Sequence, residues 1–137
     1  LGLNLRLPEI NAAIATVQMK KLPKFLKTRE KNAKLLSKLL SKSNLDLPVE
    51  RKNENVNWYL YTVSTSKRNM LLKKLNAKGI GAASYYPIPV HKTPFYKSKT
   101  KLPITDWAAS NVLSLPIHPK VTAKNIEFIA KTVSEIL

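Results

Sequence analysis

Apolar residues recur at spacings of three and four near the start of the chain, a pattern that predicts a helix from about Pro8 to Lys21. Proline followed by Glu9 suits a first turn, because proline needs no N–H partner there and a carboxylate meets the positive end of the helix dipole. Pro23 cannot donate a helical hydrogen bond and predicts a break or kink. The expected buried face comprises Ile10, Ala13, Ile14, Val17 and Lys21/Leu22.

A second helical pattern follows over residues 24–42. Its lysines lie mainly on the other faces, and a solvated basic face is the interpretation favoured over an interaction surface. The apolar stripe of this second helix comprises Phe25, Leu26, Ala33, Leu36, Leu39 and Leu40.

The middle of the chain alternates between strand and helix patterns. Aromatic and β-branched residues predict a strand over 56–65. A helix follows, with Ser66 as its expected N-cap and Gly79 as its C-terminal glycine. Residues 80–89 return to an extended pattern.

The last third contains a proline-punctuated loop and two further helices. The loop runs from Pro87 to Pro103, and loops of this length are usually functional or disordered. Residues 104–115 predict a short amphipathic helix, and Thr122 caps the closing helix. Its inward residues are expected to be Ile126, Ile129, Ala130, Val133 and Ile136/Leu137.

These elements together predict an α+β fold, with long N-terminal helices followed by a small antiparallel sheet of two to three strands covered by helices. A hydrophobic content of 44% over 137 residues supports about one domain with a real core. The chain begins at Leu1 with its helical pattern almost under way, so we expect the carboxy-terminal piece of something longer.

Charge and cysteine content narrow the function classes. The net charge is +16, from 24 Lys and Arg against 8 Asp and Glu, which suggests a nucleic-acid or acidic partner. Only four residues are arginine, however, and the lysines are dispersed along helices, which argues against a nucleic-acid readout surface. The absence of cysteine excludes disulfides, and two histidines make a metal site implausible. With no membrane-length apolar run and no leader, we expect a cytoplasmic protein without a membrane partner.

Motif searching is mostly negative. The sequence contains no glycine-rich phosphate loop, GxSxG elbow or HExxH pair, and its acids form no close pair for general acid/base work. Asn4 and Arg6 alternate with leucines, so their side chains would share a direction next to a helix start and could hold a phosphate or carboxylate. A terminal tail without a role is the open alternative.

Aromatic and histidine side chains are concentrated in the proline-rich loop and just before it. Tyr85, Tyr86, His91 and Tyr96 lie there on a stiff backbone, and a packed, hydrogen-bonded cluster is the alternative to a functional site. His118, close to two prolines, is expected to be structural.

Several segments taken in order resemble one enzyme family. They are GLNLRLPEINAAIATVQMKKL, R…NA…L, WYLYTV, R…L…L…GI, YYPIPVH and NVLSLPIHP. The ordered set resembles the carboxy-terminal part of the DegT/DnrJ/StrS sugar aminotransferases, which are pyridoxal-phosphate enzymes of the aspartate-aminotransferase fold. The resemblance implies a small domain of that fold at residues 23–137 and the end of the large domain, with its interface segment, at residues 1–22.

The resemblance also implies site residues. Asn4 of the GxNxR motif would reach the cofactor phosphate of the other subunit of a homodimer, with Arg6 beside it near cofactor or substrate. Tyr86 and His91 of YPxPxH would line the nucleotide-sugar site. Family members often carry histidine before the YP pair, where this chain has Tyr85.

The same resemblance limits what the chain does alone. The family's Schiff-base lysine lies upstream of GxNxR, so we assign no catalytic residue here and expect the chain to be inactive without a complementary upstream polypeptide. Two alternatives stay open: a non-catalytic binding or dimerisation module, and a basic nucleic-acid-binding protein. Neither the sugar nor the choice between transamination and dehydration follows from these residues.

Overall fold

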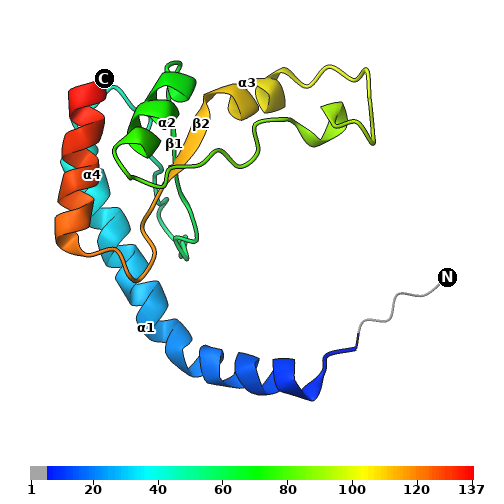
Figure 1. Cartoon of the computed structure of the whole chain (residues 1–137), viewed down its shortest axis with the longest axis vertical. Coiled ribbons are helices and arrows are strands. Elements are labelled where there is room, and N and C mark those ends of the chain that lie inside the picture. Colours follow the sequence, from blue (N-terminus) through cyan, green and yellow to red (C-terminus); the bar gives the residue numbers. More distant parts are fainter. Residues whose placement is uncertain (1–5) are drawn as a thin grey trace.

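The computed structural model describes residues 6–137 and shows an α+β arrangement, which confirms the predicted fold class (Figure 1). A long first helix extends away from a small sheet, and the last helix lies beside the first (Figure 1). In chain order the elements are α1 (Glu9–Leu40), β1 (Tyr61–Ser64), α2 (Arg68–Ala77), the 3-10 turn η1 (Val90–Lys92), α3 (Pro103–Asn111), β2 (Val112–Leu115) and α4 (Ala123–Ile136).

The first helix is continuous, so the predicted interruption at Pro23 is wrong. Pro23 lies inside the 32-residue helix α1 and is exposed, with intact helical turns on both sides. A single proline removes one hydrogen bond and crowds the preceding turn, and the usual response is a bend. The ribbon bends accordingly in its blue first half (Figure 1).

The sheet has two antiparallel strands, with Tyr61 opposite Leu115 and Ser64 opposite Val112. Residues 112–115 were expected to end a helix, but they form β2, because the helix stops at Asn111 and extended pairing satisfies their backbone groups. The predicted strand over 56–65 is shorter than expected, since Trp58 has a positive φ of 51° that breaks the extended backbone. A third strand is reduced to one bridge between Ala83 and Ser114.

The core lies between the sheet, α2, α4 and the second half of α1. Asn32 of α1 is buried there, and its Nδ2 donates to the carbonyls of Val121 at 2.9 Å and Ile117 at 3.3 Å. Fully buried side chains come from every layer: Leu36, Leu40, Tyr61, Val63, Leu71, Leu75, Leu113, Ile126 and Val133. The helices are therefore tied to the sheet by apolar packing and by one amide that reaches across 85 to 89 residues.

The helix ends follow the sequence signals in two of three cases. Thr122 and Asn125 form the expected capping box of α4. Gly79 has φ +77°, and N–H groups of Gly79 and Ile80 return to the last turn of α2, as a glycine cap requires. Ser66 is not the N-cap: α2 begins one residue later than expected, after Lys67, without a side-chain cap.

The apolar face predicted for the first helix is not buried within this chain. Ile10, Ile14 and Val17 are 75%, 56% and 50% exposed. In the second half, Ala33, Leu36 and Leu40 are buried as expected, whereas Leu26 and Leu39 are exposed. Within residues 6–137, no helix combines the length and the apolar character needed to cross a bilayer.

Candidate functional site

Of the two predicted cofactor residues, Arg6 is described, and it lies just before the start of α1. Asn4 lies outside the described residues. Arg6 is exposed on extended chain two residues before Pro8, where α1 is about to begin. The blue start of α1 and the yellow-green segment with Tyr86 and His91 lie well apart in Figure 1. The structure therefore does not bring Arg6 together with those two residues within this chain.

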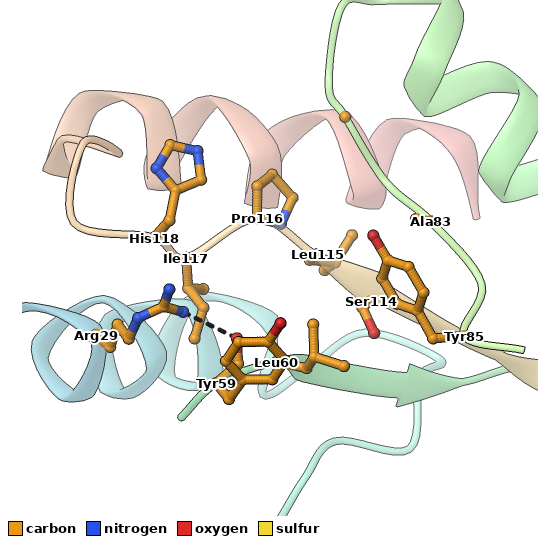
Figure 2. Close-up of a pocket in the computed structure, with 11 residues that line it drawn as sticks. Arg29, Tyr59, Leu60, Ala83, Tyr85, Ser114, Leu115, Pro116, Ile117 and His118 are labelled. Carbon is orange, nitrogen blue, oxygen red and sulfur yellow. Dashed lines mark hydrogen bonds between the residues drawn. The ribbon is translucent and has the colours of Figure 1, made fainter. Parts of the chain in front are cut away.

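The two adjacent tyrosines face different hollows. Tyr85 and Tyr86 are 52% and 74% exposed, and their rings meet edge to face with centroids 6.0 Å apart. Both line a shallow hollow of about 210 Å³ with Val90 and Ala108, but only Tyr85 also lines the larger site shown in Figure 2. Tyr85 is thus the one of the pair that reaches the site shown in Figure 2.

His91 is turned toward α3. Its side chain is 11% exposed, and its Nε2 lies 3.7 Å from Oδ1 of Asp106. Lys92 places its Nζ 2.7 Å from the same carboxylate oxygen. Asp106 therefore joins η1 to the first turns of α3 and closes the base of the loop between them. The substrate role given to His91 stays a prediction.

A hollow of about 240 Å³ opens at the end of the sheet, and we call it the Arg29 hollow (Figure 2). Arg29 comes from α1, Tyr59 from the chain before β1, and Ser114 from β2. In Figure 2, Arg29 and His118 lie at one end, Tyr85 and Ser114 lie at the other, and Tyr59 lies between them. Segments far apart in the sequence therefore bring these polar side chains into one hollow. The rest of its lining is apolar: Leu60, Gly81, Ala83, Leu115, Pro116 and Ile117.

Arg29 is fixed by the backbone that it faces. Its Nη1 donates to the carbonyls of Tyr59 at 2.8 Å and Trp58 at 3.3 Å. Its guanidinium carbon lies 5.7 Å from the centroid of the Tyr59 ring, within cation–π range. Among residues 6–137, no carboxylate lies within 4.0 Å of this half-buried guanidinium.

A second, more apolar depression adjoins the first and shares Arg29, Tyr59 and His118 with it; we call it the apolar groove. It has a volume of about 540 Å³. Its remaining wall comes from α1 and from the turn after β2: Leu22, Phe25, Leu26, Asn57, Pro119 and Lys120. In the part of the chain that the structure describes, no acidic residue lines either depression.

Arg68 holds the chain that leads to Tyr85. It is buried at the start of α2, donates from Nη1 to the Ser84 hydroxyl, and donates from Nη2 to the carbonyl of Ala109 at 2.9 Å. The Ser84 hydroxyl in turn donates to the carbonyl of Val112 at 3.1 Å. The buried guanidinium of Arg68 therefore fixes the position of Ser84, the residue directly before Tyr85.

Sequence reasoning assigned no role to Arg29, Tyr59 or Arg68. A signal was present, because arginine is rare in this lysine-rich chain. Arg68 uses two nitrogens, Nη1 for the Ser84 hydroxyl and Nη2 for the Ala109 carbonyl, and the planar fork of arginine suits that pair of acceptors better than a lysine ammonium does. Arg29 binds its two carbonyls through Nη1 alone.

Comparison with known proteins gives one consistent result. The model of the DegT/DnrJ/EryC1/StrS aminotransferase family matches residues 1–134. A pleiotropic regulatory protein of Geobacillus stearothermophilus is 32% identical over 98% of this chain and 38% of its own length. The dTDP-3-amino-3,4,6-trideoxy-alpha-D-glucose transaminase of Streptomyces venezuelae is 36% identical over 86% of this chain and 32% of its own length.

Solved structures agree with these relatives. The crystal structure of S. venezuelae DesV in complex with a ketimine intermediate superposes with a TM-score of 0.90 at 31% identity, over 95% of this chain and 36% of DesV. An aminotransferase from Brucella abortus gives a TM-score of 0.88 at 26% identity, over 97% of this chain and 36% of that protein. The chain thus spans about a third of the proteins that it matches, from 32% to 38% of their length.

Proposed function

Because this chain belongs to the DegT/DnrJ/EryC1/StrS aminotransferase family, we propose that it is the C-terminal part of a pyridoxal-phosphate-dependent aminotransferase acting on keto-sugar nucleotides. The observation that carries the proposal is the family match over residues 1–134. Further relatives are named as aminotransferases of UDP-linked sugars in Pseudomonas aeruginosa and Acidithiobacillus ferrooxidans, at 33% and 30% identity. Since the chain spans 36% and 38% of these two relatives, the remaining machinery belongs to the rest of the polypeptide.

The start of α1 fits the phosphate of such a cofactor. Pro8 offers no side-chain acceptor to the helix, and the first helical hydrogen bond is donated by Ala12, so the preceding N–H groups of α1 have no acceptor among residues 6–137 and could meet an anion. Arg6 adds an exposed cation beside them. We propose that Asn4 and Arg6 hold the cofactor phosphate of a second subunit in a homodimer.

The bound cofactor would supply an electron sink, while protein groups bind and orient the reactants. We propose that the lysine it requires lies outside this chain. Tyr86 and His91 would form part of the nucleotide-sugar wall, with the Asp106 contact keeping His91 in place.

The exposed apolar face of α1 supports an interface role for residues 1–22. Ile10, Ile14 and Val17 present apolar surface that a complete enzyme would cover with its large domain or with a second subunit. Residues 23–137 would then form the small domain, with its own core.

The test uses the complete polypeptide that carries this chain. It should bind pyridoxal phosphate, detected by the absorbance of the bound cofactor, and transfer an amino group from glutamate to a keto-sugar nucleotide. Arg6→Gln should weaken cofactor binding about tenfold, the effect of losing a charge-assisted hydrogen bond. Arg51→Gln, at another exposed arginine, is the matched control and should bind normally.

The isolated 137-residue chain gives the complementary result. After borohydride treatment it should carry no cofactor on any unique lysine. A specific adduct at one lysine would overturn the assignment of the nucleophile to another segment. Failure of the complete polypeptide to bind the cofactor would overturn the proposed function itself.

A further inference from the structure

We propose that the Arg29 hollow is a binding subsite for an oxyanion, the carboxylate or phosphate group of a small organic anion whose apolar part lies in the adjoining apolar groove. Within this chain the Arg29 hollow does not include Arg6, the described member of the proposed cofactor pair, which lies just before the start of α1. The proposed function enters only in naming two sources of the oxyanion: the carboxylates of an amino donor and the phosphates of a nucleotide sugar.

The first support is an uncompensated cation. Arg29 is half-buried, and its described partners are two neutral carbonyls, those of Trp58 and Tyr59. Its Nη2 and Nε groups have no acceptor among residues 6–137. A partly desolvated guanidinium gains most from an acceptor that carries negative charge and accepts two parallel N–H groups, as carboxylates and phosphates do.

The second support is the chemistry of the walls. Tyr59 and Tyr85 add hydroxyl groups to the hollow, and His118 adds an imidazole (Figure 2). Lys120 adds a second cation to the apolar groove. A guanidinium, two phenols and an imidazole line the hollow, and among residues 6–137 no carboxylate lines either depression, so an anion is favoured over a cation.

The third support is that the site is held ready by strained backbone. Trp58 has a φ of 51°, a left-handed conformation that costs a bulky residue about 1–2 kcal/mol. This conformation turns the carbonyls of Trp58 and Tyr59 toward Arg29, which donates a hydrogen bond to each of them. The same contacts leave the guanidinium fixed against the Tyr59 ring, so little side-chain entropy is lost when an anion binds.

The apolar groove sets the rest of the ligand. Leu22, Phe25 and Leu26 of α1 form its floor next to the Arg29 hollow. A bare inorganic ion would leave this surface empty, whereas an aliphatic dicarboxylate or a sugar phosphate would cover part of it. The Arg29 hollow has a volume of about 240 Å³ and the apolar groove a volume of about 540 Å³, and these sizes suit a small metabolite.

The experiment is a titration of the 137-residue chain followed by backbone amide NMR. One arm adds 2-oxoglutarate, a second adds L-glutamate, and a third adds inorganic phosphate. We expect saturable shifts around Tyr59 and His118 in at least one arm. Saturation by the dicarboxylates alone assigns the site to the amino donor, and saturation by phosphate alone assigns it to the nucleotide sugar.

Variants separate the site from general attraction to a basic protein. Arg29→Gln should weaken binding about tenfold or more, while Arg51→Gln, with the same loss of charge at an exposed position, should change it less than about twofold. Arg29 also binds the backbone carbonyls of Trp58 and Tyr59, so its replacement could disturb the fold. His118→Gln and Tyr59→Phe therefore test the site independently, and each should weaken binding about threefold without loss of the folded spectrum.

Two results would overturn the proposal. One is equal weakening by Arg29→Gln and Arg51→Gln, with shifts spread over the lysines of α1. The other is the absence of saturable shifts with all three probes. Neither result bears on whether the complete polypeptide transfers amino groups, because the titration involves no cofactor and no turnover.

Discussion

The two halves of α1 differ in what covers them. In the second half, Asn32, Ala33, Leu36 and Leu40 are buried against the sheet and α4, whereas in the first half the apolar side chains are exposed. Both halves follow the same apolar period. Apolar periodicity therefore predicts which face of a helix is suited to burial. It does not show whether the surface that buries this face belongs to the same 137 residues.

The largest difference in stability is expected when one apolar residue is truncated in each half of α1. Leu36→Ala removes a fully buried side chain and should lower the free energy of unfolding by about 3 kcal/mol. Ile14→Ala removes an exposed one and should change it by less than about 0.5 kcal/mol. Urea denaturation of the isolated chain measures both. Equal losses would mean that the first half is packed in solution.

A second pair compares asparagines. Asn32→Ala leaves the Ile117 and Val121 carbonyls without a partner in the core and should cost about 2 kcal/mol. Asn11→Ala lies in the exposed first half and should be close to neutral or slightly stabilising, since alanine is the better helix former. Thermal unfolding of the two variants checks the difference. A cost near zero for Asn32→Ala would show that water replaces the amide.

A third test concerns the link between the second half and the sheet. The Ser37 hydroxyl and the Tyr61 phenol lie 2.8 Å apart, and burial raises the pKa of Tyr61 although this hydrogen bond lowers it in part. Tyr61→Phe removes the bond and should cost about 1 kcal/mol near neutral pH.

The same substitution has a signed pH dependence. With its pKa raised in the fold, Tyr61 contributes stability that is fully present below its unfolded pKa of about 10 and is lost as pH rises through the folded value. The stability gap between the parent chain and Tyr61→Phe should therefore be constant up to about pH 9 and shrink as the pH rises above the unfolded pKa of about 10. A gap that widens with alkali would contradict the assignment.

The smallest effect on global stability is expected at the junction of the two halves. Pro23→Ala restores a helical N–H and should slow amide exchange in residues 20–26, with a change in the free energy of global unfolding of less than about 0.5 kcal/mol. In the parent chain, amides of residues 10–22 should exchange much faster than those of residues 30–40, because an uncovered helix is marginal in water. Hydrogen exchange followed by NMR measures both.

Local signals predicted the elements whose causes are local. The closing helix carried its capping residue Thr122 and its apolar period within one stretch, and Gly79 marked the end of α2 through its own backbone freedom. β2 was missed because Val112 to Leu115 continue an apolar pattern after a helix, and only pairing with β1, about 50 residues earlier in the chain, makes them a strand.

The Arg29 hollow could not be predicted for the same reason. The carbonyls that fix Arg29 lie 29 and 30 residues away, and they face it only because Trp58 adopts a left-handed conformation. The roles given to Asn4, Arg6, Tyr86 and His91 came from family resemblance and stay predictions. Of these, the placement of His91 against Asp106 is the contact that sequence spacing gave no reason to expect.

The continuity of α1 also has a mechanical consequence. A helix of 32 residues is about 48 Å long, and the C-terminal half of α1 is anchored in the core by Leu36 and Leu40. It therefore acts as a lever arm: a tilt of the core by about 5° displaces the start of the helix by about 3–4 Å over the roughly 40 Å that separate them. The position of Arg6 would then change with the orientation of the core. The stiffness of the helix at Pro23 would set how much of the tilt is transmitted to Arg6.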